Sequence, residues 1–168
     1  MNWEQGIAQA FSMDETVWQR HANPWSVWTR ATVLPLLAVA VWSRDWWGGW
    51  AVIPVGLVLV WTWLNPRLFA KPASTNNWAS KAVLGERVWL NREQIPVPEH
   101  HRQAPIILNL ISALGLPFLV WGLAMFHIWS TLLGICLVYC GKFWFLDRMV
   151  WLYEDMKNTA SEYRSCLY

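Results

Sequence analysis

The sequence predicts an all-α protein that crosses a lipid bilayer four times, in two helical hairpins. The first observation is a set of long apolar stretches almost free of charge, at residues 25–43, 46–64, 104–126 and 128–141. The second is composition, because only 14% of the residues are charged, where a soluble domain carries about 25%. The third is the presence of 16 tryptophans, whose rings suit the membrane–water boundary because they combine an apolar body with a polar N–H.

The four stretches differ in quality. Residues 46–64 and 104–126 contain no charged residue, and each is long enough for a hydrocarbon core of roughly 30 Å. The first stretch contains Arg30 near one end, from where the side chain can extend toward the headgroups. Lys142 lies at the inner end of the fourth stretch, and we expect its helix to continue into water as residues 142–153. Pro54 and Pro117 are expected to kink their helices without breaking them.

The distribution of lysine and arginine predicts the orientation. The short connections at residues 43–48 and 127 hold one of the 13 cationic residues, Arg44, and the other 12 lie on the opposite side of the spans. By the positive-inside rule, both termini and the central loop are therefore expected in the cytoplasm. No cleavable signal peptide is expected. The chain is interpreted as one membrane domain, 1–168, divided into an N-terminal interfacial segment, a first hairpin, a cytoplasmic loop, a second hairpin and a tail (1–24, 25–64, 65–103, 104–153 and 154–168).

Two interfacial helices are expected on the cytoplasmic side. The sequence Ser12-Met13-Asp14-Glu15 matches a capping box, which predicts a helix that begins at Met13 and ends before Asn23-Pro24. Ahead of it, an apolar stripe is suited to the bilayer surface (Trp3, Ile7, Phe11). In the central loop, a second apolar set recurs at helical spacing (Trp78, Ala82, Gly85, Trp89).

Basic side chains at the inner boundary are the main candidate site. Arginine forks match the geometry of phosphate and carboxylate groups, and nearby acidic residues suggest a folded polar network in place of a simple electrostatic anchor. Positive-inside topology alone would also place cations here. The candidate ligand-binding residues are Asn23, Arg30, Arg67, Arg87, Arg92, Arg102, Lys142 and Arg148.

Three histidines on the same side are candidate proton carriers near neutral pH, namely His21, His100 and His101. Four carboxylates could approach them, Glu86, Asp147, Glu154 and Asp155. Glu86 or Asp147 would orient the histidines. No metal site is predicted, because no H-E-x-x-H or H-x-x-x-H spacing occurs and adjacent histidines in a loop rarely face one ion. The sequence identifies no cofactor.

Small residues in the fourth span predict close helix packing. Cys136 and Cys140 are four residues apart and therefore share a face. We expect them, with Gly134 and Gly141, to be small packing residues of a membrane helix.

The chain resembles an uncharacterised family of small prokaryotic integral membrane proteins, known as a domain of unknown function. The resemblance runs from about Met13 to Met156, through residues 20–30, 61–69, 81–92, 100–102 and 142–155. It implies a multi-pass protein of the prokaryotic cytoplasmic membrane, and it assigns no activity and no site.

Three functions remain open at this point. The leading one is a cytoplasm-facing site that binds or acts on an anionic lipid or amphiphile. The second is a homo-oligomeric channel or small-solute carrier, with a few polar wall groups (Thr62, Asn109, Ser112, Tyr139). The third is an accessory subunit of a larger membrane complex. No nucleic-acid partner is expected, and the sequence does not decide whether the protein is an enzyme.

Overall fold

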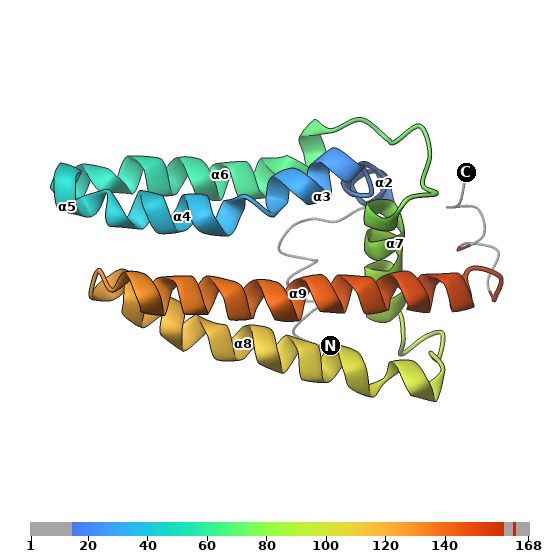
Figure 1. Ribbon diagram of the computed structural model, residues 1–168. Helices are drawn as coiled ribbons and strands as arrows, with labels where there is room; N and C mark the ends of the chain where they lie inside the picture. Colours follow the sequence, from blue (N-terminus) through green and yellow to red (C-terminus); the bar gives the residue numbers. More distant parts are fainter. Residues whose placement is uncertain (1–14, 160–162, 164–168) are drawn as a thin grey trace.

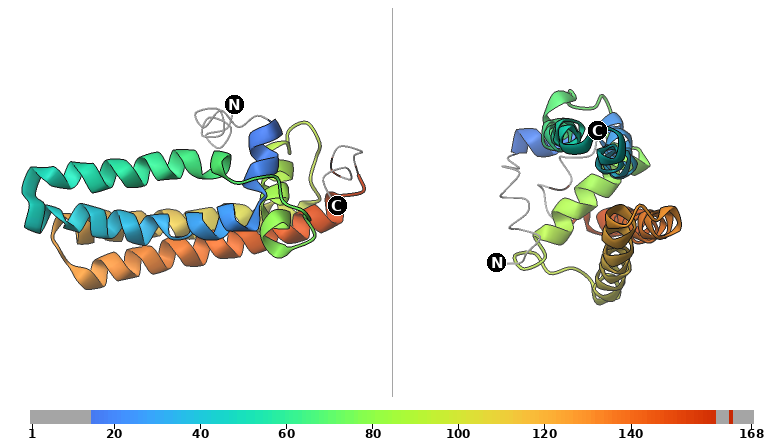
Figure 2. Two further views of the ribbon diagram at one scale, coloured as in Figure 1. Left: turned by 90° about the horizontal axis from the view of Figure 1, so that it is seen from above. Right: turned by 90° about the vertical axis from the view of Figure 1, so that its left-hand side faces the viewer.

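The computed structural model describes residues 15–159 and residue 163, and the regular structure in this part of the chain is helical. Two long helical hairpins share one direction, and a shorter helix, α7, lies across one end of both (Figure 1). We call this the α7 end and the opposite end the turn end. Viewed along the hairpins, α7 reaches from one hairpin to the other (Figure 2).

The first hairpin is built from short helices. α2 (Glu15–His21) ends before Asn23-Pro24, as the sequence predicts. The chain then runs outward and reverses at the turn end, where Gly48 has a φ of 54° that a side chain would disfavour. The elements in order are α3 (Pro24–Arg30), α4 (Val33–Trp42), α5 (Arg44–Trp47), the 3₁₀ turn η1 (Gly48–Ala51) and α6 (Val52–Leu68). The predicted capping-box residues 12–14 and the apolar stripe of Trp3, Ile7 and Phe11 lie outside the described residues.

The second hairpin has two long helices. It is entered through the 3₁₀ turn η2 (Glu99–His101) and consists of α8 (Gln103–Ala124) and α9 (Ile128–Met156). α8 continues through Pro117 without a break, as predicted. Pro54 lies in the first turn of α6, where proline removes no intrahelical hydrogen bond. The 29 residues of α9 span about 44 Å, so this helix is longer than a hydrocarbon core is thick.

Three stretches are long and apolar enough to cross a membrane, Pro24–Leu68, Glu99–Ala124 and Ile128–Met156. The first of them folds back on itself at α5 and η1. Large apolar side chains point outward along these helices; for example, Leu57 is 65% exposed and Leu114 is 63% exposed. A soluble monomer rarely presents such continuous apolar faces. The outward-facing surface is therefore consistent with a membrane protein.

Exposed tryptophans gather near both ends of the hairpins. At the turn end they are Trp46, Trp47, Trp50 and Trp129, and near the α7 end they are Trp25, Trp63, Trp144 and Trp151. On α9, Trp129 is separated from Trp144 and Trp151 by about 22 and 33 Å of helix. These separations bracket the roughly 30 Å of a hydrocarbon core, as expected for two interfacial belts.

Glycines bring α8 and α9 into close contact. A Cβ on Gly115 would lie 2.7 Å from the Gly134 carbonyl oxygen, and one on Gly141 would lie 2.5 Å from the Leu108 carbonyl oxygen. The predicted packing role of Gly134 and Gly141 is confirmed, because small residues let membrane helices approach closely.

The corresponding prediction for the two cysteines is wrong, since Cys136 and Cys140 are exposed. At about 100° per residue, they fall on the side of α9 opposite to Gly134.

Arg44 joins the two hairpins at the turn end. Its Nη2 atom donates to the carbonyl oxygens of Leu123 at 2.5 Å and Ala124 at 2.7 Å. These carbonyls belong to the last turn of α8, which has no intrahelical donors for them. The positive charge also suits the negative end of the helix dipole. The one cation predicted at the turn end is therefore a helix cap.

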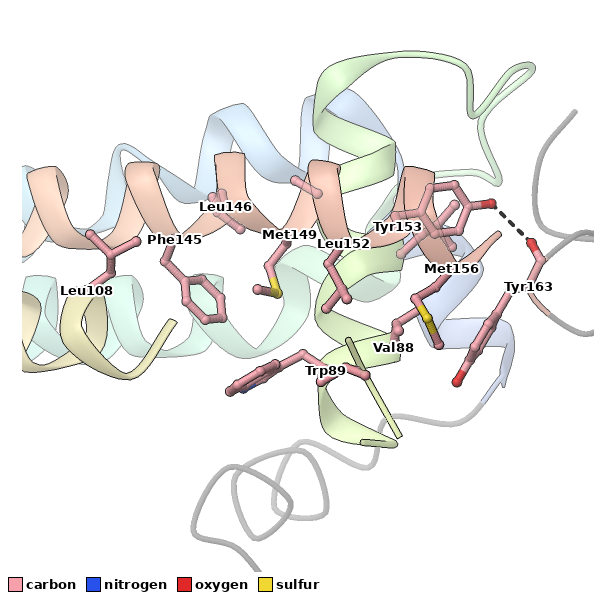
Figure 3. Packing of buried hydrophobic residues seen from close by; sticks show 13 residues of the cluster. Val88, Trp89, Leu108, Phe145, Leu146, Met149, Leu152, Tyr153, Met156 and Tyr163 are labelled. Carbon is pink, nitrogen blue, oxygen red and sulfur yellow. Dashed lines mark hydrogen bonds between the residues drawn. The ribbon is translucent and has the colours of Figure 1, made fainter. Parts of the chain in front are cut away.

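α7 (Trp78–Leu90) is the helix predicted in the central loop, and the helix itself is confirmed. Three members of its apolar stripe, Ala82, Gly85 and Trp89, are buried, and this side of α7 packs on the part of α9 beyond the bilayer-length segment. The resulting core contains Val88, Trp89, Met149, Leu152 and Met156 (Figure 3). Tyr163 packs there too, and its carbonyl oxygen accepts a hydrogen bond from the Tyr153 hydroxyl at 3.1 Å.

The crossing of α7 over α9 depends on Gly85. A Cβ at this position would lie 1.9 Å from the Met149 carbonyl oxygen, so Gly85→Ala must push the two helices apart. We expect a loss of about 1–3 kcal/mol of stability, the usual cost of overpacking, measured as a lower thermal unfolding midpoint in detergent.

Gly56→Ala is the matched control, because a Cβ there meets nothing within 4 Å. It should leave the midpoint unchanged or raise it slightly, since alanine favours a helix. Equal midpoints for the two variants would contradict the proposed contact.

Candidate functional site

The predicted site residues gather toward the α7 end but enter several separate contacts. The first is a buried polar cluster between α2, α3 and α6. Arg30 Nη2 donates to His21 Nδ1 at 2.9 Å. Ser26 Oγ, which lies 3.3 Å from the same ring nitrogen, donates to Asn65 Oδ1 at 2.8 Å. Asn65 is fully buried and its Nδ2 donates to Thr29 Oγ1 at 2.8 Å. This cluster fixes α2 and α3 against the end of α6.

His21 is held in its neutral form. Burial is the main reason that its pKa lies well below the usual value, and the positive charges of Arg30 and Lys142 lower the pKa further. Because Arg30 donates to Nδ1, that nitrogen is an acceptor and the proton of the neutral ring is on Nε2. His21 thus has the environment of a structural acceptor.

Ion pairs occupy the surface between α7 and α9. Lys142 Nζ lies 2.5 Å from Glu86 Oε1, and Lys81 Nζ lies 2.6 Å from Glu154 Oε1. Asp147 accepts from Trp78 Nε1 at 3.2 Å and from Arg148 at 3.4 Å. Within the described residues, neither Glu86 nor Asp147 hydrogen-bonds a histidine. Their geometry serves to hold α7 on α9.

A third set secures the chain after α6. Arg20 Nη1 donates to the Arg67 carbonyl oxygen at 3.1 Å, and Asn23 Nδ2 donates to that of Ala70 at 2.9 Å. Arg67 itself stacks on Trp63, with Cζ 4.0 Å from the ring centroid. Arg87 lies in the last turn of α7.

A groove between the end of α7 and the first half of α8 holds the remaining two arginines. Its volume is about 650 Å³. Apolar side chains from one face of α8 form its long wall, Ile106, Leu110, Ala113 and Leu116. Their spacing of three or four residues aligns them over about 15 Å of helix. Trp89, Val97, Asn109, Ser112 and Val138 complete the lining, together with Arg92 and Arg102.

The two arginines of the groove differ in how firmly they are held. Arg92 Nη1 donates to the Trp89 carbonyl oxygen at 2.8 Å, and its guanidinium lies 4.3 Å from the Trp89 ring centroid. Arg102 is exposed, and within the described part of the chain its side chain makes no hydrogen bond or ion pair. The groove thus offers one fixed and one adaptable guanidinium above an apolar wall.

Sequence reasoning named both arginines but not the groove that they share. The sequence predicts Trp89 on an interfacial helix, and Asn109 and Ser112 are candidate wall groups only under the alternative of a channel. The sequence does not identify the apolar wall of the groove, because its residues have the same composition as any lipid-facing stripe.

His100 and His101 meet on η2. Their Nε2 atoms lie 3.3 and 2.8 Å from Asp155 Oδ2 near the end of α9. Of the four carboxylates expected near these histidines, Asp155 is the one that meets His100 and His101 within the described residues. The sequence did not single it out, since 54 residues separate it from His101.

Comparison with known proteins identifies a family. Residues 2–166 match the model of a family of unknown function, DUF6653. This match confirms the predicted resemblance to an uncharacterised family. No curated protein and no solved structure shows a significant match to the chain.

The depressed pKa of His21 predicts acid sensitivity. Below the unfolded-state pKa of about 6.5, the unfolded chain binds a proton at this residue that the folded chain does not bind. The stability that neutral His21 provides is therefore present above pH 6.5 and declines as the pH falls through and below it, by up to about 1.4 kcal/mol per pH unit.

Unfolding of the wild type and His21→Gln in detergent, compared between pH 7.5 and pH 5.5, checks this; the variant should lose less stability on acidification. His127→Asn is the control, because His127 is exposed at the turn end and asparagine preserves its helix-capping role. An unchanged pH dependence in His21→Gln would show that the histidine titrates normally.

Proposed function

Since the chain belongs to DUF6653, a family of unknown function, we propose its function from the site itself: the protein spans a membrane four times and binds an anionic amphiphile in the groove beside α8. The observation that carries the proposal is the combination of two guanidinium groups, Arg92 and Arg102, with an apolar wall along one face of α8. The headgroup would lie at the arginines, and a hydrocarbon chain would lie along α8.

Four crossings follow from treating each arm of the first hairpin as a span. Residues 24–42 and 48–68 contain 19 and 21 residues, which reach about 30 Å each when helical. The α7 end carries most of the cations, so the positive-inside rule places it in the cytoplasm. The turn end, with Arg44 and Asp45, would face the outside.

The headgroup chemistry supports an anion. Arginine forms charge-assisted, bidentate hydrogen bonds with phosphate and carboxylate groups. The first turn of α8 contains no acidic residue and no side-chain cap, so the positive end of its dipole also favours negative charge next to Arg102. A phospholipid or another amphiphile with a phosphate or carboxylate headgroup fits these donors.

The groove is accessible from the bilayer. Ile106, Leu110 and Leu116 are at least half exposed, and they lie in a candidate span. An amphiphile of the inner leaflet can therefore enter sideways, with its chain remaining in the hydrocarbon throughout. No desolvation of apolar surface is then needed, and the arginines select for the charge of the headgroup.

The polar groups expected to line a pore support this proposal over a channel. Asn109 and Ser112 line the groove. Thr62 donates to the Val58 carbonyl oxygen at 2.8 Å, and Tyr139 donates to that of Ala31. Homo-oligomerisation and a role as an accessory subunit stay predictions.

Binding is tested by native mass spectrometry of the detergent-purified protein with phosphatidylglycerol or phosphatidylcholine added. The wild type should retain the anionic lipid preferentially. Arg92→Ala/Arg102→Ala should bind it at least about tenfold more weakly, because hydrogen bonds to charged groups contribute about 1.5–3 kcal/mol each.

Arg20→Ala/Arg67→Ala is the matched control, since it removes two cations from the same end without changing the groove lining. It should bind like the wild type. Equal losses in the two double variants would show that overall charge, and not the groove, retains the lipid.

The orientation is tested by labelling single cysteines in a variant that lacks Cys136, Cys140 and Cys166. A membrane-impermeant maleimide should label Asp45→Cys in intact cells and Glu93→Cys only after lysis; both side chains are exposed. The reverse pattern would overturn the proposed orientation.

A further inference from the structure

We propose that His100, His101 and Asp155 form a binding site for a divalent transition-metal ion of the Zn²⁺ type. One ligand atom from each residue is available, and these three atoms lie within 4.8 Å of one another. The proposal does not depend on the groove or on its occupant, since none of the three residues lines it.

Adjacent histidines in a loop rarely face one ion, but the backbone of η2 allows His100 and His101 to do so. Pro98 precedes this single 3₁₀ turn, which is closed by hydrogen bonds of 3.0 Å from His101 N to the Pro98 carbonyl oxygen and from Arg102 N to that of Glu99. In this conformation the two imidazole rings lie side by side, with centroids 4.2 Å apart and planes at 44°. Both Nε2 atoms approach the same oxygen of Asp155. The turn thus supplies the special backbone that two neighbouring ligands require.

Asp155 differs from the neighbouring carboxylates, because its side chain pairs with histidines and not with lysine or arginine. Three other carboxylates near α7 and α9 pair with lysine or arginine, namely Glu86, Asp147 and Glu154. The Asp155 carboxylate, within the described residues, forms hydrogen bonds or ion pairs with His100 and His101 and with no lysine or arginine. A divalent cation bound by all three groups would balance the carboxylate.

The ligand set and its spacing fit Zn²⁺. Two histidines and one carboxylate, with water at the fourth position, form a recognised type of zinc site. Bonds of about 2.0–2.1 Å in tetrahedral geometry separate ligand atoms by about 3.3 Å. The distance from His100 Nε2 to Asp155 Oδ2 is already 3.3 Å, and that from His101 Nε2 is 2.8 Å. A small increase in the distance between His101 Nε2 and Asp155 Oδ2 would therefore make room for the ion.

The three side chains differ in exposure, so the site has one fixed ligand and is still open to water. The His101 side chain is 8% exposed, so its ring is fixed by its surroundings, whereas the side chains of His100 and Asp155 are 67% and 51% exposed. An ion can enter from water and meet one preset ligand and two adjustable ones. Once bound, it would tie η2, and hence the start of α8, to the end of α9.

The test uses the full chain without a polyhistidine tag, purified in detergent and stripped of metal with a chelator. Titration calorimetry with Zn²⁺ should show one saturable site per chain, and Co²⁺ should give the visible absorption of a tetrahedral complex. His100→Ala should bind Zn²⁺ at least about tenfold more weakly, because it removes one ligand, and should lose the Co²⁺ spectrum.

His100→Ala keeps the 2.8 Å contact between His101 and Asp155, so its unfolding midpoint without metal should equal that of the wild type. His127→Asn removes a histidine at the turn end and should bind Zn²⁺ normally. Absence of saturable Zn²⁺ binding in the wild type, or equal affinity in His100→Ala, would overturn the proposal.

Discussion

The close backbone contact of α7 and α8 with α9 is the constraint on which the rest of the structure depends. α9 is longer than a hydrocarbon core is thick, and its two halves have different partners. In the first half, glycines allow α8 to lie directly against it. In the second half, Gly85 allows α7 to cross it at the Met149 carbonyl. Because both helices are fixed to the same rod, the end of α7 is held beside the start of α8, and the groove is formed between them.

Polar side chains close the first hairpin at the α7 end and join it to α8 at the turn end. In hydrocarbon or at its edge, an unpaired polar group costs several kcal/mol, so such groups are paired internally. The buried chain of hydrogen bonds from Arg30 through His21 and Ser26 to Asn65 secures one end of that hairpin. Arg44 secures the other end by capping α8. Both cations therefore already have partners, and the proposed anion site is at Arg92 and Arg102 instead.

The sequence predicted those features that depend on position along the long helices. Hydropathy predicted the apolar stretches, and the helices of the second hairpin and α7 follow the predicted segments. The sequence did not predict which neighbouring helix each basic side chain faces. The basic residues gather toward the same end of the helices but enter distinct contacts. Position along a helix does not determine which neighbour each side chain meets. For the same reason the stripe on α7 was recognised, whereas its partner α9 was not. The prediction for the cysteines was wrong because Cys136 and Cys140 share one face of α9, whereas the glycines that contact α8 lie on the opposite face.

The sequence also did not single out the exact partners among residues that are distant in the chain. Asn65 ends an apolar stretch and gave no sign that it would be fully buried among Ser26 and Thr29. Asp155 meets His100 and His101 only because α7 and α8 set the position of η2 relative to α9. These contacts arise from helix packing, and no local pattern encodes them.

A structure of the protein in a lipid nanodisc that contains anionic phospholipid would test the central claim most directly. The account predicts elongated density along Ile106, Leu110 and Leu116, with the headgroup between the Arg92 and Arg102 guanidinium groups. A groove closed by its own side chains, or an anionic headgroup bound elsewhere while these arginines face bulk water, would contradict it.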